Sequence, residues 1–169
     1  MKILLYFFLL ICCYTDIKER RVRNAVVVPA LLAGLFYNLY SGGAAGLIFS
    51  LKGFSAGFAM IFFTVLIGVA GAGDLKFLCT VGAMAGPGTA VWGAFYGAAM
   101  AAVFGVGLML YRGCLISNLY FSIDQAVRIF NGLARGKVYT PGVSDDVTVP
   151  FAAFLSAGTF IAFNLGGLI

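Results

Sequence analysis

Residues 44–70 read AAGLIFSLKGFSAGFAMIFFTVLIGVA, an apolar run in which Lys52 is the one charged residue. A helix of about 20 apolar residues crosses the hydrocarbon core of a bilayer, so this run is long enough to span a membrane. It ends at the glycine-rich segment GAGDLK, residues 71–76. An ionisable side chain beside a membrane helix is energetically costly, and Asp74 is therefore a candidate functional residue.

The composition of the whole chain agrees with a membrane location. Of its 169 residues, 62% are apolar and 10% are charged, and the mean hydropathy is +1.03. Roughly a quarter of the residues in water-soluble domains are charged. The composition therefore predicts an integral membrane protein, with residues 1–169 as a single domain. The formal net charge of +5 indicates the topology of the loops rather than a nucleic-acid partner.

Other apolar runs accompany the first. They are residues 3–15, 25–40, 75–85, 89–111 and 150–169. We expect an all-α, polytopic bundle of about six transmembrane helices. The opening MKILLYFFLLICC resembles a secretory signal, but no small-x-small cleavage pattern follows it, and we expect a retained first helix.

Two further patterns bear on the packing of these helices. Around residues 116–134, apolar and polar side chains recur at helical spacing. This predicts an amphipathic helix in the cytoplasmic interface, as a connector rather than a lid over a site. Three pairs of glycines are spaced four apart: Gly53 and Gly57, Gly82 and Gly86, Gly93 and Gly97. Such spacing lets membrane helices approach closely, here within one bundle rather than in a dimer seam.

The basic residues cluster in three gaps between the apolar runs. They are Lys18, Arg20, Arg21 and Arg23 in the first gap, Lys76 in the second, and Arg112, Arg128, Arg135 and Lys137 in the third. If all six runs cross the membrane, these gaps lie on one side, which the positive-inside rule assigns to the cytoplasm. Asp16 follows the first run and Asp74 precedes the fourth at that face. We therefore expect two carboxylates from distant parts of the chain at one membrane depth.

The residue types present limit the chemistry that the chain can perform. There is no histidine, and the four cysteines form no C-x-x-C pair. This argues against a zinc site of the usual spacing and excludes Ser-His and Cys-His catalysis, and we expect no metal or cofactor. The other acids have ordinary explanations. Glu19 would balance the charge of neighbouring arginines, and Asp124 would be a solvated carboxylate. Asp145 and Asp146 would be solvated in a turn or would lie as negative charges at a helix N-terminus.

Asp16 and Asp74 remain as the candidate pair. Two carboxylates in a poorly solvated place share one proton, because both cannot ionise cheaply. The ionised member can activate water while the neutral one protonates a carbonyl oxygen, which is peptide-bond hydrolysis without a metal. Gly71 and Gly73 would allow sharp backbone geometry and close approach of an extended substrate. Lys76 would mark the cytoplasmic border or support the ionised carboxylate. For an isolated aspartate, a helix cap or an interfacial anchor is an equally good reading.

The sequence resembles the type IV prepilin peptidases, which are membrane aspartic proteases. DIKERRVRN at 16–24 is similar to the family's aspartate-basic-asparagine pattern, which ends here at Asn24. GAGDLKFLCTVGAMAG at 71–86 is similar to the G-x-G-D-x-K motif and its helix, and VPFAAFLSAG at 149–158 to the closing segment. The resemblance implies that Asp16 and Asp74 are the catalytic pair at the cytoplasmic face of the inner membrane. The implied substrate is a prepilin or pseudopilin, cut between a short basic leader and its hydrophobic helix.

Two features differ from the family's usual pattern. Arg23 precedes Asn24 where the family often has proline, and nothing corresponds to the C-x-x-C domain that larger members carry with their N-methyltransferase activity. The chain therefore looks like the compact form associated with Flp or tight-adherence pili. The alternative from another class is a small proton- or cation-coupled transporter that uses the aspartates as ion ligands. It predicts acids near mid-membrane in broken helices within repeated halves, and no convincing repeat is present.

Overall fold

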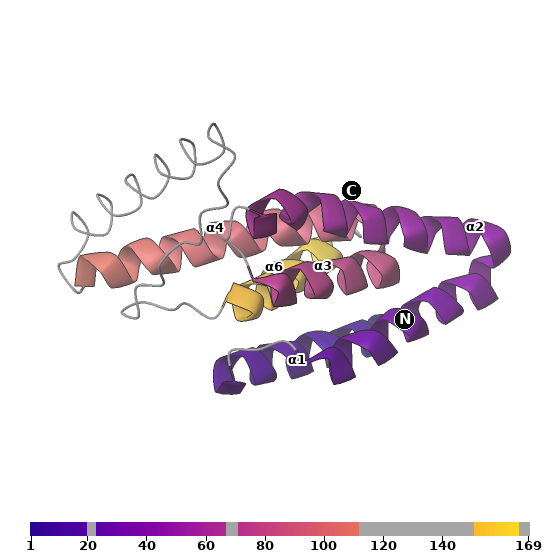
Figure 1. Cartoon of the computed structure of the whole chain (residues 1–169), viewed down its shortest axis with the longest axis horizontal. Coiled ribbons are helices and arrows are strands. Elements are labelled where there is room, and N and C mark those ends of the chain that lie inside the picture. Colours follow the sequence, from indigo (N-terminus) through magenta and orange to yellow (C-terminus); the bar gives the residue numbers. More distant parts are fainter. Residues whose placement is uncertain (20–22, 67–70, 112–150, 166–169) are drawn as a thin grey trace. The chain divides into compact units, whose positions relative to one another are not determined.

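The computed structural model describes residues 1–19, 23–66, 71–111 and 151–165. These residues form helices α1 (Lys2–Glu19), α2 (Asn24–Leu66), α3 (Ala72–Ala85), α4 (Pro87–Tyr111) and α6 (Phe151–Leu165) (Figure 1). No strand occurs among the described residues, which confirms the all-α prediction for this part of the chain. The amphipathic helix predicted near 116–134 lies outside the described residues.

Helix α2 turns back on itself at a glycine. Gly43 has φ 56° and ψ −140°, a left-handed conformation that favours a residue without a Cβ atom. Across the turn, the Asn38 side-chain amide donates to Ser50 Oγ at 2.7 Å. Gly46 packs so closely against the Asn38 carbonyl that a Cβ at position 46 would overlap it. The predicted break between the apolar runs 25–40 and 44–70 is therefore confirmed, and Figure 1 shows the two limbs of α2 as a hairpin.

The chain divides into two compact units. The first comprises Met1–Met100 together with Pro150–Ile169, and the second comprises Ala101–Val149. Within the second unit, the described residues are the C-terminal part of α4, residues 101–111. The first unit contains α1, α2, α3 and α6, and both candidate aspartates belong to it.

Glycines let the helices of the first unit pack with their backbones nearly in contact. A Cβ at Gly53 would overlap the Gly82 carbonyl, which brings the second limb of α2 against α3. A Cβ at Gly97 would overlap the backbone and side chain of Leu155, where α4 meets α6. The glycine pairs predicted to serve close packing within one bundle are thus confirmed in that role.

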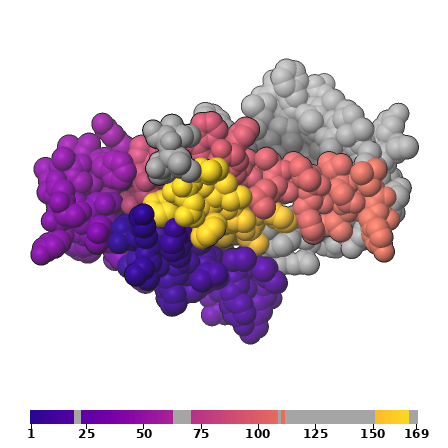
Figure 2. Space-filling view, turned by 180° about the vertical axis from the view of Figure 1, so that it is seen from behind, coloured from indigo at the N-terminus to yellow at the C-terminus, as the bar shows by residue number. Residues whose placement is uncertain are grey.

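Helix α1 packs antiparallel to α6. Near the start of α1, the Tyr6 hydroxyl donates to Asn164 Oδ1 of α6 at 3.1 Å, and the Tyr6 ring lies 5.4 Å from that of Phe160. Figure 2 shows the two helices side by side, with α1 in indigo and α6 in yellow. The end of α1 therefore lies beside the beginning of α6.

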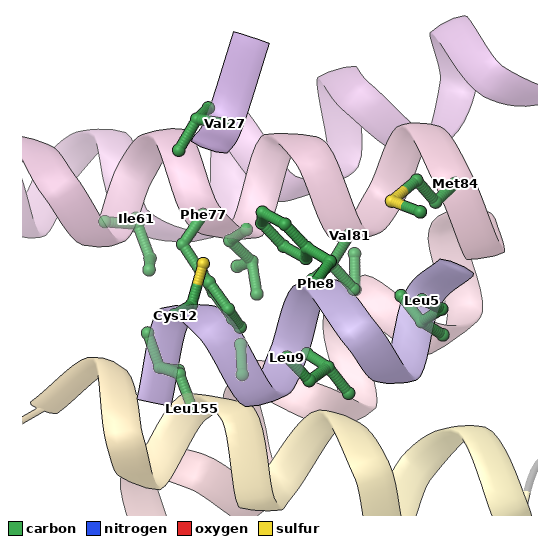
Figure 3. Packing of buried hydrophobic residues seen from close by; sticks show 13 residues of the cluster. Leu5, Phe8, Leu9, Cys12, Val27, Ile61, Phe77, Val81, Met84 and Leu155 are labelled. Carbon is green, nitrogen blue, oxygen red and sulfur yellow. The ribbon is translucent and has the colours of Figure 1, made fainter. Parts of the chain in front are cut away.

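A buried cluster between the helices holds α1 against α3 as well. Phe8 of α1 stacks on Phe77 of α3 with ring centroids 5.5 Å apart, and Figure 3 shows both rings within the core. Leu155 of α6 joins this cluster from the other side of α1. Burial of these side chains stabilises the three-helix contact, at about 1.5–3 kcal/mol for each large apolar residue. The end of α1 is thereby placed beside the first turns of both α3 and α6.

Two helices in the described part of the chain are long and apolar enough to cross a membrane. The first runs from Asn24 to Phe62 and includes both limbs of the α2 hairpin, and the second runs from Pro87 to Leu108. In their most apolar stretches of 18 residues, 22% and 17% are buried in the protein. The core helix of a water-soluble protein would be mostly buried, so these exposed apolar surfaces suit contact with lipid. α3 and α6 have 14 and 15 residues, fewer than the roughly 20 that span a bilayer. The bundle of six transmembrane helices stays a prediction.

Candidate active site

Asp16 lies in the last turn of α1, where its side chain is 7% exposed. Its Oδ2 atom accepts a hydrogen bond of 3.0 Å from the backbone N–H of Ala153 in α6. The first N–H groups of a helix have no partner within the helix, so a carboxylate beside them satisfies one of these donors. The carboxylate also lies at the positive end of the α6 dipole, which favours its ionised form.

Asp74 lies in the first turn of α3 and is 9% exposed. Its Oδ2 atom accepts a hydrogen bond of 3.2 Å from the backbone N–H of Gly71. This is the second half of a capping box, in which an acidic side chain at the third helical position reaches back to the residue before the helix. The Asp74 side chain therefore caps the start of its own helix.

The sharp backbone geometry expected at the GAGD glycines is not present at Gly71. Gly71 has φ −78° and ψ 149°, an extended conformation that any residue adopts. Gly73 lies within α3. That part of the prediction was wrong, because the α3 N-terminus is formed by the Asp74 side chain and needs no left-handed residue.

Asp16 and Asp74 are close enough for the charge of one to act on the other. Burial raises the pKa of Asp74, the Gly71 N–H lowers it, and the charge of Asp16 raises it further, to about 6. Asp74 precedes the apolar run 75–85 and lies outside both candidate membrane spans. Two partly desolvated carboxylates that repel each other hold a shared proton more tightly than an isolated carboxylate does.

Two pairs of polar side chains connect helices at the end of the bundle that contains Asp16 and Asp74. Lys76 Nζ donates to Asn24 Oδ1 at 3.0 Å, which ties the beginning of α2 to the first turns of α3. Glu19 accepts two hydrogen bonds from Arg23, at 2.7 and 2.6 Å, across the connection between α1 and α2. The prediction that Glu19 balances a neighbouring arginine is confirmed.

A family model for the type IV leader peptidases matches residues 3–106. The chain belongs to the type IV leader peptidase family. Membership indicates a peptidase, that is, a hydrolase, and together with the apolar helices it indicates an integral membrane protein. No curated protein and no solved structure matches the chain. The match contains Asp16 and Asp74 but ends before α6, which supplies the Ala153 amide to Asp16.

Two contacts of this site were not foreseen from the sequence. Lys76 was interpreted by its charge alone, and its bond to Asn24 depends on how α2 and α3 pack. The Ala153 N–H belongs to the backbone, so the side chain at that position carries no sign of it. The available signal was Pro150 before an apolar run, since proline often marks the beginning of a helix and hence a set of unpaired N–H groups.

Proposed function

We propose that the protein is a membrane aspartic endopeptidase in which Asp16 and Asp74 form the catalytic pair. The supporting observation is the interaction of two buried carboxylates, from α1 and α3, in a member of the leader peptidase family. The substrate is a prepilin or pseudopilin with a short basic leader and a hydrophobic helix. The leader stays in the cytoplasm while the helix lies in the bilayer, so the bond to be cut lies near the cytoplasmic face.

Hydrolysis follows from a pair that carries one proton. The ionised carboxylate takes a proton from water, whose oxygen attacks the carbonyl carbon while the neutral carboxylic acid protonates the carbonyl oxygen. The carboxylic acid formed from the base then protonates the leaving nitrogen as the carbon–nitrogen bond breaks, and a hydroxyl of the tetrahedral intermediate returns its proton to the other carboxylate as the new carboxyl group forms. The pair then again holds one proton, and no covalent enzyme intermediate or metal takes part in these steps.

The residues around the pair have supporting roles in this proposal. The bond between Lys76 and Asn24 holds the start of α2 beside α3, which keeps the end of the bundle closed around the two carboxylates. Gly71 supplies the N–H that holds Asp74 in its rotamer, and Gly73 leaves the first turn of α3 without a side chain at that position. The lipid bilayer is a partner in the sense that it presents the substrate helix.

The test is co-expression with a candidate prepilin, with cleavage read from the size of the pilin. Asp16→Asn and Asp74→Asn should each leave the prepilin uncut, because neither variant can share a proton between two carboxylates. The matched control is Glu19→Gln, which removes an exposed carboxylate on the same helix as Asp16. Normal cleavage by either aspartate variant, at wild-type protein levels, would contradict the proposal.

A further inference from the structure

The two candidate catalytic carboxylates are held by donors of different origin. The donor to Asp74 is Gly71, three residues before it in the chain. The donor to Asp16 is Ala153, 137 positions away and on another helix. The bond from Ala153 to Asp16 therefore exists only while the beginning of α6 is docked against the end of α1.

The contacts of α6 keep its first turn at this place. Ala152 and Leu155 are almost completely buried, each 1% exposed. At the far end of the helix, the bond between Tyr6 and Asn164 fixes α6 along α1. Two contacts at opposite ends of an antiparallel pair determine its register, so the Ala153 N–H is directed at Asp16 by the packing of the whole helix.

Among the described residues, titratable groups from α1 and from α3 interact electrostatically with Asp16. Cys12 and Cys13 precede it on α1, and Asp74 faces it from α3. The described part of α6 contains no ionisable side chain. The influence of α6 on Asp16 is therefore exerted by the Ala153 N–H and by the positive end of the helix dipole, both of which favour a carboxylate over a carboxylic acid.

We propose that the first turn of α6 is a positioning element of the active site, which holds Asp16 ionised so that Asp16 is the general base and Asp74 the general acid. This inference rests on the function proposed above and assigns unequal roles to the pair. It also extends the site beyond the part of the chain that matches the family, residues 3–106. The high proton affinity of Asp74, which follows from its burial and from the charge of Asp16, agrees with a role as acid.

The first experiment removes the Ala153 N–H and leaves the two carboxylates in place. In Ala153→Pro the donor is lost, and proline is tolerated in the first turn of a helix because no preceding turn clashes with its ring. Ala153→Gly is the matched control, since it removes the methyl group but keeps the N–H. Both variants are purified as full chains in detergent and assayed with a prepilin over a range of pH.

We expect Ala153→Pro to lower kcat about tenfold to a hundredfold, the usual effect of losing one hydrogen bond to a charged group. KM should change little, because no substrate contact is removed. The acidic limb of the pH profile should move to higher pH, because Asp16 then needs a higher pH to be ionised. Ala153→Gly should keep the wild-type profile. Equal kcat and an unchanged acidic limb in Ala153→Pro would overturn the proposal.

A second variant guards against a general disturbance of α6 by proline. Replacing residue 153 by lactic acid changes the amide to an ester, which removes the N–H and keeps the methyl group and the helical backbone. It should reproduce the shift of the acidic limb, and a wild-type pH profile in this variant would overturn the proposal even if Ala153→Pro fails to fold. If Asp16→Asn cleaves the prepilin normally, the assignment of Asp16 and Asp74 as the catalytic pair is wrong. If Asp16→Asn is inactive and the ester has no effect, only the role of α6 is wrong.

Discussion

Asp16 at the end of α1 and Asp74 at the beginning of α3 are both buried, and both accept a backbone hydrogen bond, but they depend on different parts of the chain. The Asp74 bond closes within one helical turn, so it forms wherever α3 forms. The Asp16 bond requires α6 to have docked. One half of the candidate site is thus a local structure, and the other half exists only in the assembled bundle.

This difference has a consequence for how the site is built. A local cap is present as soon as its helix is present, whereas a contact between distant segments is lost when either helix shifts. The α3 half is further secured by the close packing of Gly53 against Gly82. Substitutions in the two halves should therefore have separate effects.

The pair should act as a unit in spite of its two different supports. We expect Asp16→Asn and Asp74→Asn each to lower kcat/KM by about 10³-fold, the middle of the usual range for general acid–base catalysis. The double variant should be no worse than either single one, because the second substitution removes nothing that still works. Rates with purified enzyme and prepilin test this. If the losses of kcat/KM in the two single variants multiply in the double variant, the two aspartates contribute independently and do not act as a pair.

Ionisation of Asp74, in the local half of the site, should lower the stability of the folded protein as pH rises. Asp74 has a folded pKa of about 6 against an ordinary value of 3.8, so its ionisation opposes folding. Its contribution to the free energy of unfolding is complete below about pH 3.8 and is lost as pH rises through 6. The loss amounts to about 3 kcal/mol at most.

Asp74→Asn should therefore unfold at a higher temperature than the wild type above pH 6, because the amide has no charge to bury. Near pH 4 the two proteins should differ little. Thermal unfolding in detergent at several pH values measures the difference, and Glu19→Gln is the exposed control. A difference that does not change between pH 4 and pH 7 would mean that the Asp74 environment does not resist ionisation.

The glycine contact between α2 and α3 can be tested by one methyl group. Gly53→Ala should destabilise the protein by about 1–3 kcal/mol, the usual cost of overpacking, since its Cβ would overlap the Gly82 carbonyl. Gly88→Ala is the matched control, because a Cβ at position 88 has no neighbour within 4 Å. Unfolding temperatures compare the two. If Gly53→Ala is as stable as Gly88→Ala, the backbones of α2 and α3 are not in close contact.

The smallest effect is expected at the polar bridge outside the pair. Lys76→Met should lower kcat/KM by a few fold, because an exposed hydrogen bond contributes about 1 kcal/mol or less. Asn24→Ala should have a similar effect, and the double variant should equal either single one if the bond is what matters. Lys52→Met, an exposed lysine at another place on α2, is the control. Additive losses would show that Lys76 and Asn24 act separately.

Several features of this protein could be predicted from the sequence because they depend on short-range rules. The apolar runs predicted helices, and the gap between the runs 25–40 and 44–70 marked the turn within α2, where Gly43 adopts a left-handed conformation. Helix order and length placed the end of the first run and the start of the fourth at the same face. The interaction between Asp16 and Asp74 agrees with that placement.

Other features could not be predicted because they depend on distances that no local pattern encodes. Gly71 was expected to adopt a special conformation, but the Asp74 side chain supplies the cap and leaves Gly71 extended. The partner of Lys76 was not predicted, because many polar groups could reach a lysine at a helix end. Its bond to Asn24 is selected by the packing of α2 against α3.

The sequence by itself determined that the described part of the chain is helical, where α2 turns, and which two carboxylates lie beside apolar runs. These properties follow from hydrophobic periodicity, from the conformational freedom of glycine and from the cost of burying charge. Only the tertiary structure decided that the Ala153 amide faces Asp16. The physical reason is that every residue except proline has the same backbone N–H, so its value as a donor depends on where the fold places it.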